Sequence, residues 1–342
     1  MLTPLSSVKS VLVIRCGALG DLIYATSVID ALRQQYGEDI AIDFVVTPGP
    51  GTIFKKDPRV RHVFNLTHRK IPNILSAEKR AIINFSKKEP YDLLLNFENG
   101  KQFVPLAKAV RAKQKVGNPF TERGDMPAEH AAEQIKRIYM PIVSRDVLDH
   151  SFPRVMGSHF NDIKTQYNLP EKYIILNPSN SHNKRHRFNY RAWPQEHWKK
   201  LINTIDTKIP IVISGGSGEE DYFKSIMPYP SNVIDLVGKT PLPDLIAITQ
   251  HAQAMITTDT GPAHLASALN TPVYALVGPT NYKATGPYQT PDNEVHIISL
   301  NLECSPCYTT PEVMFACTNN RCMNEISSEM VLKELAPVLE KF

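Results

Sequence analysis

Residues 255–279 read MITTDTGPAHLASALNTPVYALVGP, and this stretch determines how the second half of the chain folds. It consists of a buried strand, a short polar turn, a helix and a second strand, the order typical of an open parallel sheet. The turn starts at Asp259, where such a sheet presents the carboxyl ends of its strands. A helix that begins there directs free backbone N–H groups and its positive end toward a ligand. Thr260 and the Gly261 amide suit a phosphate, with Asp259 and His264 as polar neighbours.

The rest of the chain repeats this alternation of strand and helix. Short segments with apolar residues predict strands at 8–15, 41–47, 60–65, 91–97, 115–117, 173–178, 210–215 and 232–236. Apolar residues at helical spacing predict helices at 22–36, 76–87, 102–111, 128–139, 195–204, 219–227, 242–250 and 327–341, and a further helix within 152–169. This pattern predicts an α/β protein built from doubly wound parallel sheets.

Length and composition bound the class of protein. A chain of 342 residues is long for one compact core, so two domains of about 150 residues each are expected. Hydrophobic residues make up 42% and charged residues 21%, as in soluble globular proteins. No apolar run reaches the roughly 18 residues of a membrane span, and residues 1–10 lack the apolar core of a signal peptide. We therefore expect a cytoplasmic protein.

Positive charge is concentrated in the first half of the chain. Residues 55–115 contain 15 Lys and Arg against 5 Asp and Glu, whereas residues 151–342 contain 16 against 18. This asymmetry favours an anionic partner or a membrane surface, and the alternative is a solvated face. No basic motif interleaved with aromatic residues is present, so a nucleic-acid partner is not expected.

The turn after the first strand contains Gly17-x-x-Gly20-Asp21. Two glycines allow the backbone to approach a ligand closely, and Asp21 lies at the crevice end of the strand. A carboxylate there can act as a general base on a substrate hydroxyl, or it can cap the helix that follows. The spacing is not the G-x-G-x-x-G of dinucleotide-binding proteins, which argues against a nicotinamide dehydrogenase.

Two further loops follow predicted strands of the second half. Residues 179–194 read SNSHNKRHRFNYRAWP, and their positive charge suits a diphosphate, although a solvated loop has the same composition. Near Gly215, a carboxylate of Glu219 or Glu220 can accept hydrogen bonds from ribose hydroxyls. Its alternative role is to interact favourably with the dipole of the helix that it begins.

The cysteines form a separate pattern. Cys304, Cys307, Cys317 and Cys322 lie in one loop, and in a reducing compartment such a set indicates a structural metal site with tetrahedral zinc or a single iron. The alternative is a set of free or partly buried thiols. No open coordination position is left for catalysis.

Taken together, these motifs resemble those of the lipopolysaccharide heptosyltransferases, glycosyltransferase family 9. The resemblance rests on four features that span nearly the whole chain, in this order: VLVIRCGALGDLIYATSVIDALR at 11–33, LNP at 176–178 with R-x-WP at 191–194, DTGPAH at 259–264 with VGPT at 277–280, and C-x2-C at 304–307 with CM at 322–323.

This resemblance implies a GT-B fold of two facing doubly wound domains with an interdomain cleft. Residues 1–169 would bind the acceptor, residues 170–326 the nucleotide sugar, and the final helix at 327–342 would pack back on the first domain. The implied reaction transfers heptose from an ADP-heptose donor to a hydroxyl of an anionic, lipopolysaccharide-core acceptor, with inversion and without a catalytic metal or other cofactor. The enzyme would be cytoplasmic, with a peripheral contact to the inner membrane.

The resemblance also implies residue roles. Asp21 matches the catalytic base, and the nucleotide-sugar contacts fall on Gly20, Ser179, Arg191, Glu220, Thr240, Asp259, Thr260, Gly261 and His264. Arg191 occupies a position that is often lysine, Glu220 would bind the ribose, and Thr240 would lie near the adenine. Lys101 would contact the acceptor.

Two departures from the family pattern leave alternatives open. The loop between Pro178 and Trp193 is long and unusually basic, and Glu98-Asn99-Gly100 replaces the usual glutamine-glycine segment. The alternatives are the same fold with another nucleotide sugar or a protein acceptor, or a nucleotide-sugar-binding protein without transfer activity.

Overall fold

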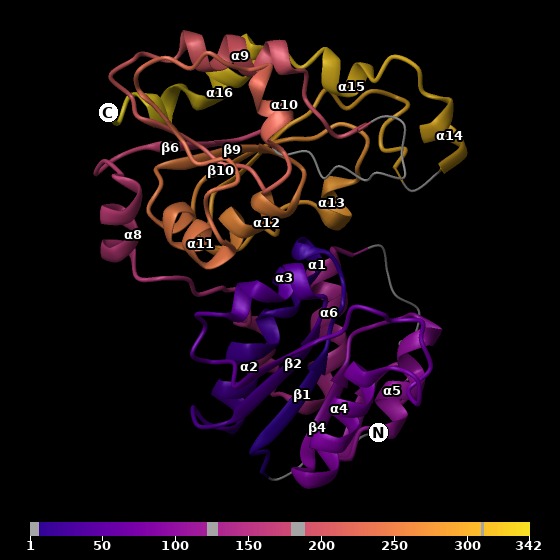
Figure 1. Cartoon of the computed structure of the whole chain (residues 1–342). Coiled ribbons are helices and arrows are strands. Elements are labelled where there is room, and N and C mark those ends of the chain that lie inside the picture. The colour runs from indigo at the N-terminus through magenta and orange to yellow at the C-terminus, as the bar shows by residue number, and fades with distance from the viewer. Residues whose placement is uncertain (1–6, 122–128, 179–188, 309–310) are drawn as a thin grey trace. The chain divides into compact units, whose positions relative to one another are not determined.

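The computed structural model describes residues 7–121, 129–178, 189–308 and 311–342. The chain forms two compact units, unit 1 over Met1–Gly157 and unit 2 over Ser158–Phe342. Each unit contains one sheet in which every strand pair is parallel, with helices packed beside it (Figure 1). The two predicted doubly wound α/β domains are confirmed.

Unit 1 has the strand order β3-β2-β1-β4-β5. Its strands are β1 Ser10–Ile14, β2 Ala41–Val46, β3 His62–Asn65, β4 Tyr91–Asn96 and β5 Ala112–Gly117. Its helices are α1 Leu19–Ala25, α2 Ser27–Tyr36, α3 Pro48–Gly51, α4 Ala77–Lys88, α5 Val104–Ala109, α6 Ala131–Tyr139 and α7 Arg145–Asp149, with 3-10 helices η1 Thr52–Phe54, η2 Lys101–Phe103 and η3 Met140–Ile142. The central strands β1 and β4 are buried almost throughout, as their continuous apolar runs predict.

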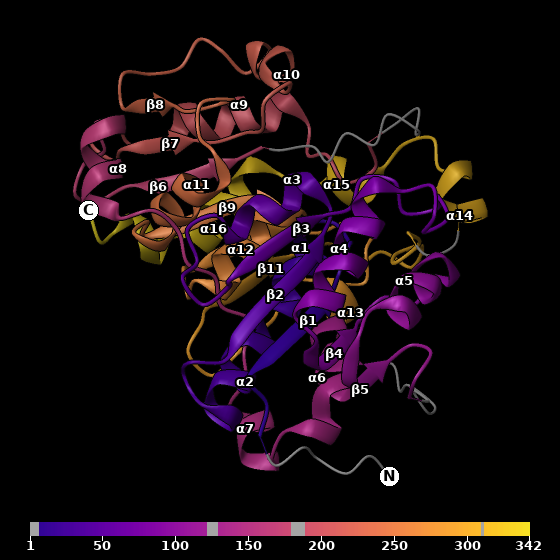
Figure 2. The same cartoon turned by 60° about the horizontal axis from the view of Figure 1, so that its bottom comes forward.

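Unit 2 has the strand order β11-β10-β9-β6-β7-β8, and Figure 2 shows β6, β7 and β8 side by side. Its strands are β6 Ile174–Asn177, β7 Ile211–Ile213, β8 Val233–Asp235, β9 Ala254–Thr258, β10 Val273–Leu276 and β11 Val295–Ile298. Its helices are α8 Phe160–Tyr167, α9 Gln195–Thr204, α10 Glu220–Lys224, α11 Leu242–Gln250, α12 Gly261–Ala268, α13 Tyr282–Thr285, α14 Pro311–Ala316, α15 Arg321–Asn324 and α16 Ser328–Leu339.

Helices cover both faces of the unit 2 sheet. Ile174 and Leu176 of β6 point to one face and pack in a cluster with α9 and α16. Tyr173 and Ile175, offset by one residue, point to the other face and pack with α8, α11 and α12. Because successive side chains of a strand alternate between faces, burial on both sides requires the unbroken apolar run seen in the sequence.

The structure moves the domain boundary toward the N-terminus. The sequence predicted a helix within 152–169 and a boundary at residue 169; α8 lies within that range, from Phe160 to Tyr167, whereas the units divide at Gly157. Helix α8 belongs to unit 2 because it packs on α11: Ser158 and Tyr167 donate hydrogen bonds to the two carboxylate oxygens of Asp244, at 2.6 and 2.9 Å.

The C-terminal helix also belongs to unit 2. Residues 327–342 were predicted to pack on the first domain, whereas α16 packs on α9 and lies within unit 2. Val331, Leu335 and Val338 are buried in the same cluster as Trp198. This apolar stripe is therefore buried within unit 2, and the packing of residues 327–342 on the first domain stays a prediction.

Two local expectations are also corrected. The helix predicted over 22–36 is divided into α1 and α2 at Thr26, whose hydroxyl donates to the Ile23 carbonyl at 2.6 Å, a local bond that competes with the helical pattern. The edge strand β11 was not predicted, because its residues are only partly buried and no long apolar run marks it. Within the described ranges, no helix has the length and apolarity needed to cross a bilayer.

Candidate functional site

The strand order of each unit reverses at one point, and the candidate residues follow the strands at these points. In unit 1 the sheet grows in opposite directions from β1 and β4, and in unit 2 from β6 and β9. Loops at the carboxyl ends of such strand pairs separate and leave a crevice, which is the usual ligand site of open α/β sheets. Asp21 follows β1, and Asp259 follows β9.

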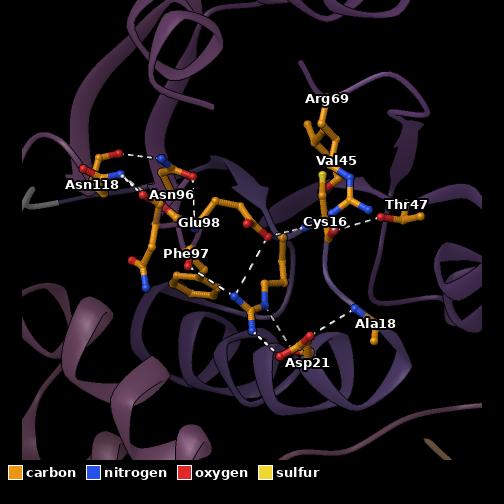
Figure 3. Close-up of polar contacts among 12 residues, drawn as sticks. Cys16, Ala18, Asp21, Val45, Thr47, Arg69, Asn96, Phe97, Glu98 and Asn118 are labelled. Carbon is orange, nitrogen blue, oxygen red and sulfur yellow. Dashed lines mark hydrogen bonds and ion pairs between the residues drawn. The ribbon is translucent and has the colours of Figure 1, made fainter. Parts of the chain in front are cut away.

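Asp21 is held at the start of α1 by contacts to both of its carboxylate oxygens (Figure 3). Oδ1 accepts a hydrogen bond from Arg15 Nη2 at 2.7 Å, and Oδ2 accepts one from the Ala18 amide at 3.0 Å. A Cβ on Gly17 would lie 2.5 Å from the Asp21 Cβ, so this turn requires glycine for the carboxylate to fold back. The Asp21 side chain is nevertheless 43% exposed, so its orientation is restricted while a substrate hydroxyl can still reach it.

Glu98 follows β4 and binds the same turn from the other side of the switch point. Its Oε1 accepts a hydrogen bond from the Cys16 amide at 2.6 Å and lies 3.9 Å from Arg15 Nη1. Arg15 thereby bridges the carboxylates of Asp21 and Glu98. Burial, followed by the negative charge of Glu98, raises the pKa of the Cys16 thiol to about 12, so this thiol remains protonated at neutral pH.

Glu98 accepts a hydrogen bond from the Cys16 amide and also places a negative charge near Arg15. Substitutions can separate these two contributions to stability. In Glu98→Gln the amide oxygen still accepts from Cys16, so we expect the free energy of unfolding to fall by no more than about 1 kcal/mol. In Glu98→Ala the Cys16 N–H loses its partner, and we expect a loss of about 1–3 kcal/mol. Urea denaturation of both variants checks this order, and equal losses would show that the charge on Glu98 is what stabilises the turn.

In unit 2, Asp259 is buried at the start of α12. Its Oδ2 accepts a hydrogen bond from the Thr280 hydroxyl at 2.5 Å, whereas its Oδ1 is buried without a hydrogen-bond partner among the described residues. A buried carboxylate oxygen without a partner is costly, and a ligand that donates a hydrogen bond would remove that cost. Thr260 is the residue before the first turn of α12, with the amide of Gly261 following it.

Arg191 contributes positive charge beside this helix start. Its Nη1 donates to the Asp259 carbonyl at 3.0 Å, and its guanidinium lies 5.2 Å from the centre of the Tyr308 ring. In the part of the chain that the structure describes, Arg191 makes no ion pair with a carboxylate. Its charge is therefore available to an anion at the N-terminus of α12.

The loops after β6, β7 and β8 lie at the same carboxyl-end edge of the unit 2 sheet. Asn177 at the end of β6 donates to the Ser214 hydroxyl at 2.8 Å, which ties together the ends of β6 and β7. Glu220 accepts from the Gly218 amide at 2.7 Å, and a Cβ on Gly238 would lie 2.4 Å from its Oε1. Glu220 thus lies beside Gly238, two residues before Thr240, and the roles of Glu220 and Thr240 toward ribose and adenine stay predictions.

The remaining predicted residues differ in their placement. Gly20 is buried in α1, His264 is 9% exposed in α12, and Lys101 is exposed at the start of η2, just after the Glu98 loop. Ser179 lies outside the described residues. The roles assigned to these residues remain predictions.

The described residues of the cysteine loop give no support to the predicted metal site. Cys304 is exposed and Cys322 is buried, and burial together with the other three thiols raises the pKa of Cys322 to about 11. Within the described ranges, no group of three or more His, Cys, Asp or Glu side chains is placed to hold a metal ion. The thiols are neighbours of unequal exposure, so the prediction of structural zinc or iron is not supported.

Sequence reasoning missed Arg15, Thr280 and Tyr308, and it treated Glu98 only as a departure from a pattern. Arg15 stands one residue and Glu98 two residues beyond the carboxyl end of a central strand, which is a signal in the sequence. Their pairing depends on β1 and β4 being neighbours, and the sequence alone does not state this.

Comparison with known proteins adds independent findings. Residues 149–316 match the model of glycosyltransferase family 9 (heptosyltransferase). Lipopolysaccharide heptosyltransferase 3 of Escherichia coli K12 is 22% identical, over 77% of this chain and 80% of that protein. A family 9 glycosyl transferase from Veillonella parvula superposes with a TM-score of 0.81 at 20% identity, over 99% of this chain and 100% of that one. The Escherichia coli heptosyltransferase WaaC with ADP-2-deoxy-2-fluoro heptose gives 0.66 at 18%, over 96% and 99%.

Proposed function

Because the chain belongs to glycosyltransferase family 9 and is a glycosyltransferase, we propose that it transfers heptose from ADP-heptose to a hydroxyl of the lipopolysaccharide core, with inversion at the anomeric carbon. One observation carries the proposal: at the switch point of unit 2, Arg191 and the start of α12 can bind an anion, next to a buried Asp259 oxygen that can accept a hydrogen bond from a hydroxyl. The relative crystallised with an ADP-heptose analogue supports this choice of donor.

The donor contacts follow from the chemistry of ADP-heptose. Arg191 and the free amide at Gly261 would bind the diphosphate, and Thr260 would add a hydroxyl donor. The unpartnered Asp259 Oδ1 would accept a hydrogen bond from a sugar hydroxyl, which removes the cost of its burial. Glu220 would accept hydrogen bonds from the ribose hydroxyls, with the adenine near Thr240.

The base would be Asp21. Its carboxylate removes the proton of the acceptor hydroxyl, the hydroxyl oxygen bonds to the anomeric carbon, and the bond from that carbon to the diphosphate breaks. ADP departs with the electron pair of that bond, and the positive charge of Arg191 stabilises it. Arg15 and the Ala18 amide orient the Asp21 carboxylate. Each donates one hydrogen bond to a different carboxylate oxygen, so a lone pair is left on each oxygen to accept the proton. No step uses a metal or another cofactor.

The acceptor would be anionic and linked to lipid. Residues 55–115 carry the excess of positive charge, and Lys101 is exposed beside the Glu98 loop. We place the reaction in the cytoplasm at the inner membrane, because all five cysteines are free, as in a reducing compartment. The alternatives are another nucleotide sugar, a protein acceptor, or donor binding without transfer.

A donor and acceptor screen tests the proposal. The purified protein is incubated with ADP-heptose, other ADP-sugars and UDP-sugars, each with and without lipopolysaccharide-core fragments, and products are identified by mass spectrometry. The expected result is acceptor-dependent release of ADP and an acceptor heavier by one heptose. Binding of ADP-heptose without transfer to any core fragment would instead favour a binding protein or a different acceptor.

A further inference from the structure

The loop between β3 and α4, residues 67–76, holds two large apolar side chains in solvent. Ile74 is 78% exposed and Leu75 is 69% exposed, the highest values for large apolar side chains among the described residues, where Phe315 follows at 55%. Two adjacent aliphatic side chains at this exposure contribute nothing to the core of unit 1. Exposed apolar groups that are adjacent and surrounded by polar residues mark interaction sites.

The backbone of loop 67–76 is held by defined contacts. Lys79, only 2% exposed, donates from its ammonium to the carbonyls of Arg69 and Ile71, both at 2.8 Å. The Leu75 amide donates to the Pro72 carbonyl at 3.0 Å, and Asn73 donates to the Pro105 carbonyl of α5 at 2.8 Å. The fold thus maintains a conformation in which Ile74 and Leu75 point outward.

The charge around the two aliphatic side chains is positive. Lys70, Arg80 and Lys108 are exposed on the loop and on the adjoining helices α4 and α5. Glu78, the acidic residue of this neighbourhood, accepts hydrogen bonds from the amides of Thr67 and His68, which satisfies its charge within the loop. The guanidinium of Arg80 donates to the Ile74 carbonyl, so positive charge lies next to these aliphatic side chains. Exposed aliphatic side chains with Lys and Arg on the same loop and adjoining helices suit the surface of an anionic bilayer, where apolar insertion and electrostatic attraction act together.

Loop 67–76 is also tied to the turn that carries Asp21. Arg69 Nη1 donates to the Cys16 carbonyl at 2.6 Å, one residue before Gly17. A membrane surface bound at the tip of this loop would therefore lie on the same edge of the unit 1 sheet as the Asp21 carboxylate. This is the arrangement that an enzyme acting on a lipid-linked hydroxyl requires.

We propose that Ile74 and Leu75 insert into the interfacial region of an anionic phospholipid bilayer while Lys70, Arg80 and Lys108 bind its headgroups. The biological purpose of this contact rests on the proposed function, but the contact itself does not need an acceptor. A second copy of the chain is disfavoured as the occupant, because it would bring two positive surfaces together. Two side chains also bury far less than the roughly 800 Å² per partner of a stable interface.

Vesicle binding tests this inference on the full chain. Cosedimentation is measured with vesicles of phosphatidylcholine alone and of phosphatidylcholine mixed with phosphatidylglycerol, all without lipopolysaccharide. We expect binding to the mixed vesicles only, at least tenfold weaker for Ile74→Ser/Leu75→Ser and for Lys70→Glu/Lys108→Glu. The matched control, Met227→Ser/Met330→Ser, replaces two exposed apolar side chains of unit 2 and should bind like the unchanged protein.

Several outcomes would overturn it. Equal binding to neutral and anionic vesicles, or unchanged binding by Ile74→Ser/Leu75→Ser, contradicts membrane insertion at this loop. A concentration-dependent dimer that the same variant abolishes would assign the surface to self-association instead. Transfer to a soluble core fragment without lipid is measured in parallel and should be unaffected in this variant, so failure of the membrane contact is distinguishable from failure of the proposed reaction.

Discussion

Asp21→Asn is expected to lower the kcat of sugar transfer by roughly 10²–10⁴-fold, the contribution of a positioned general base. Asparagine has the shape of aspartate, and its amide oxygen can still accept the hydrogen bond from Ala18 that begins α1. It cannot take a proton from the acceptor. The Kd for the ADP-sugar, measured by calorimetry, should stay nearly unchanged, while ADP release in the presence of acceptor falls.

The matched control is Asp149→Asn, which removes another partly exposed carboxylate of unit 1 that forms an ion pair, with Arg145. This control should keep full activity. Thermal unfolding of both variants shows whether a lost cap rather than a lost base explains the result. Transfer by Asp21→Asn within tenfold of the unchanged enzyme would mean that Asp21 only caps α1 and that the base lies elsewhere.

Arg191→Ala should weaken ADP-sugar binding by about 10–100-fold, the loss expected for charge-assisted hydrogen bonds worth roughly 1.5–3 kcal/mol. Arg191 sits beside the start of α12 with its guanidinium against the Asp259 carbonyl and the Tyr308 ring. Arg191→Lys should recover part of the affinity, because lysine keeps the charge without the planar pair of donors. Calorimetric titration with ADP and with the ADP-sugar measures both effects.

Arg145→Ala is the control for this substitution, since it removes an exposed arginine from α7 in unit 1. Its affinity for ADP should not change. If Arg191→Ala bound ADP as tightly as the unchanged protein, the diphosphate would have to lie away from the N-terminus of α12. Weaker binding of ADP and of adenosine to the same degree would point to a displaced adenine subsite rather than a lost phosphate contact.

Much of the fold follows from patterns that each segment carries by itself. The runs at 11–14 and 173–176 are apolar at every position, which only a strand covered on both faces accommodates. The edge strand β11 and the division between α1 and α2 were not predicted, because partial burial leaves no continuous run and the hydroxyl of Thr26 acts through a local bond. The apolar stripe of helix α16 is clear in the sequence, but it does not identify α9 as the helix on which α16 packs.

The sequence by itself therefore determined which segments form the buried strands. It also determined that Asp21 and Asp259 follow two of these strands, where a parallel sheet binds its ligands. Only the tertiary structure decided which strands are neighbours. Parallel pairing of β1 with β4 brings Glu98 to the turn of Arg15 and Asp21, 82 residues away from the amide of Cys16 that it binds. The physical reason is that hydrophobic periodicity reports the burial of a strand's faces, whereas strand order is set by packing between elements far apart in the chain.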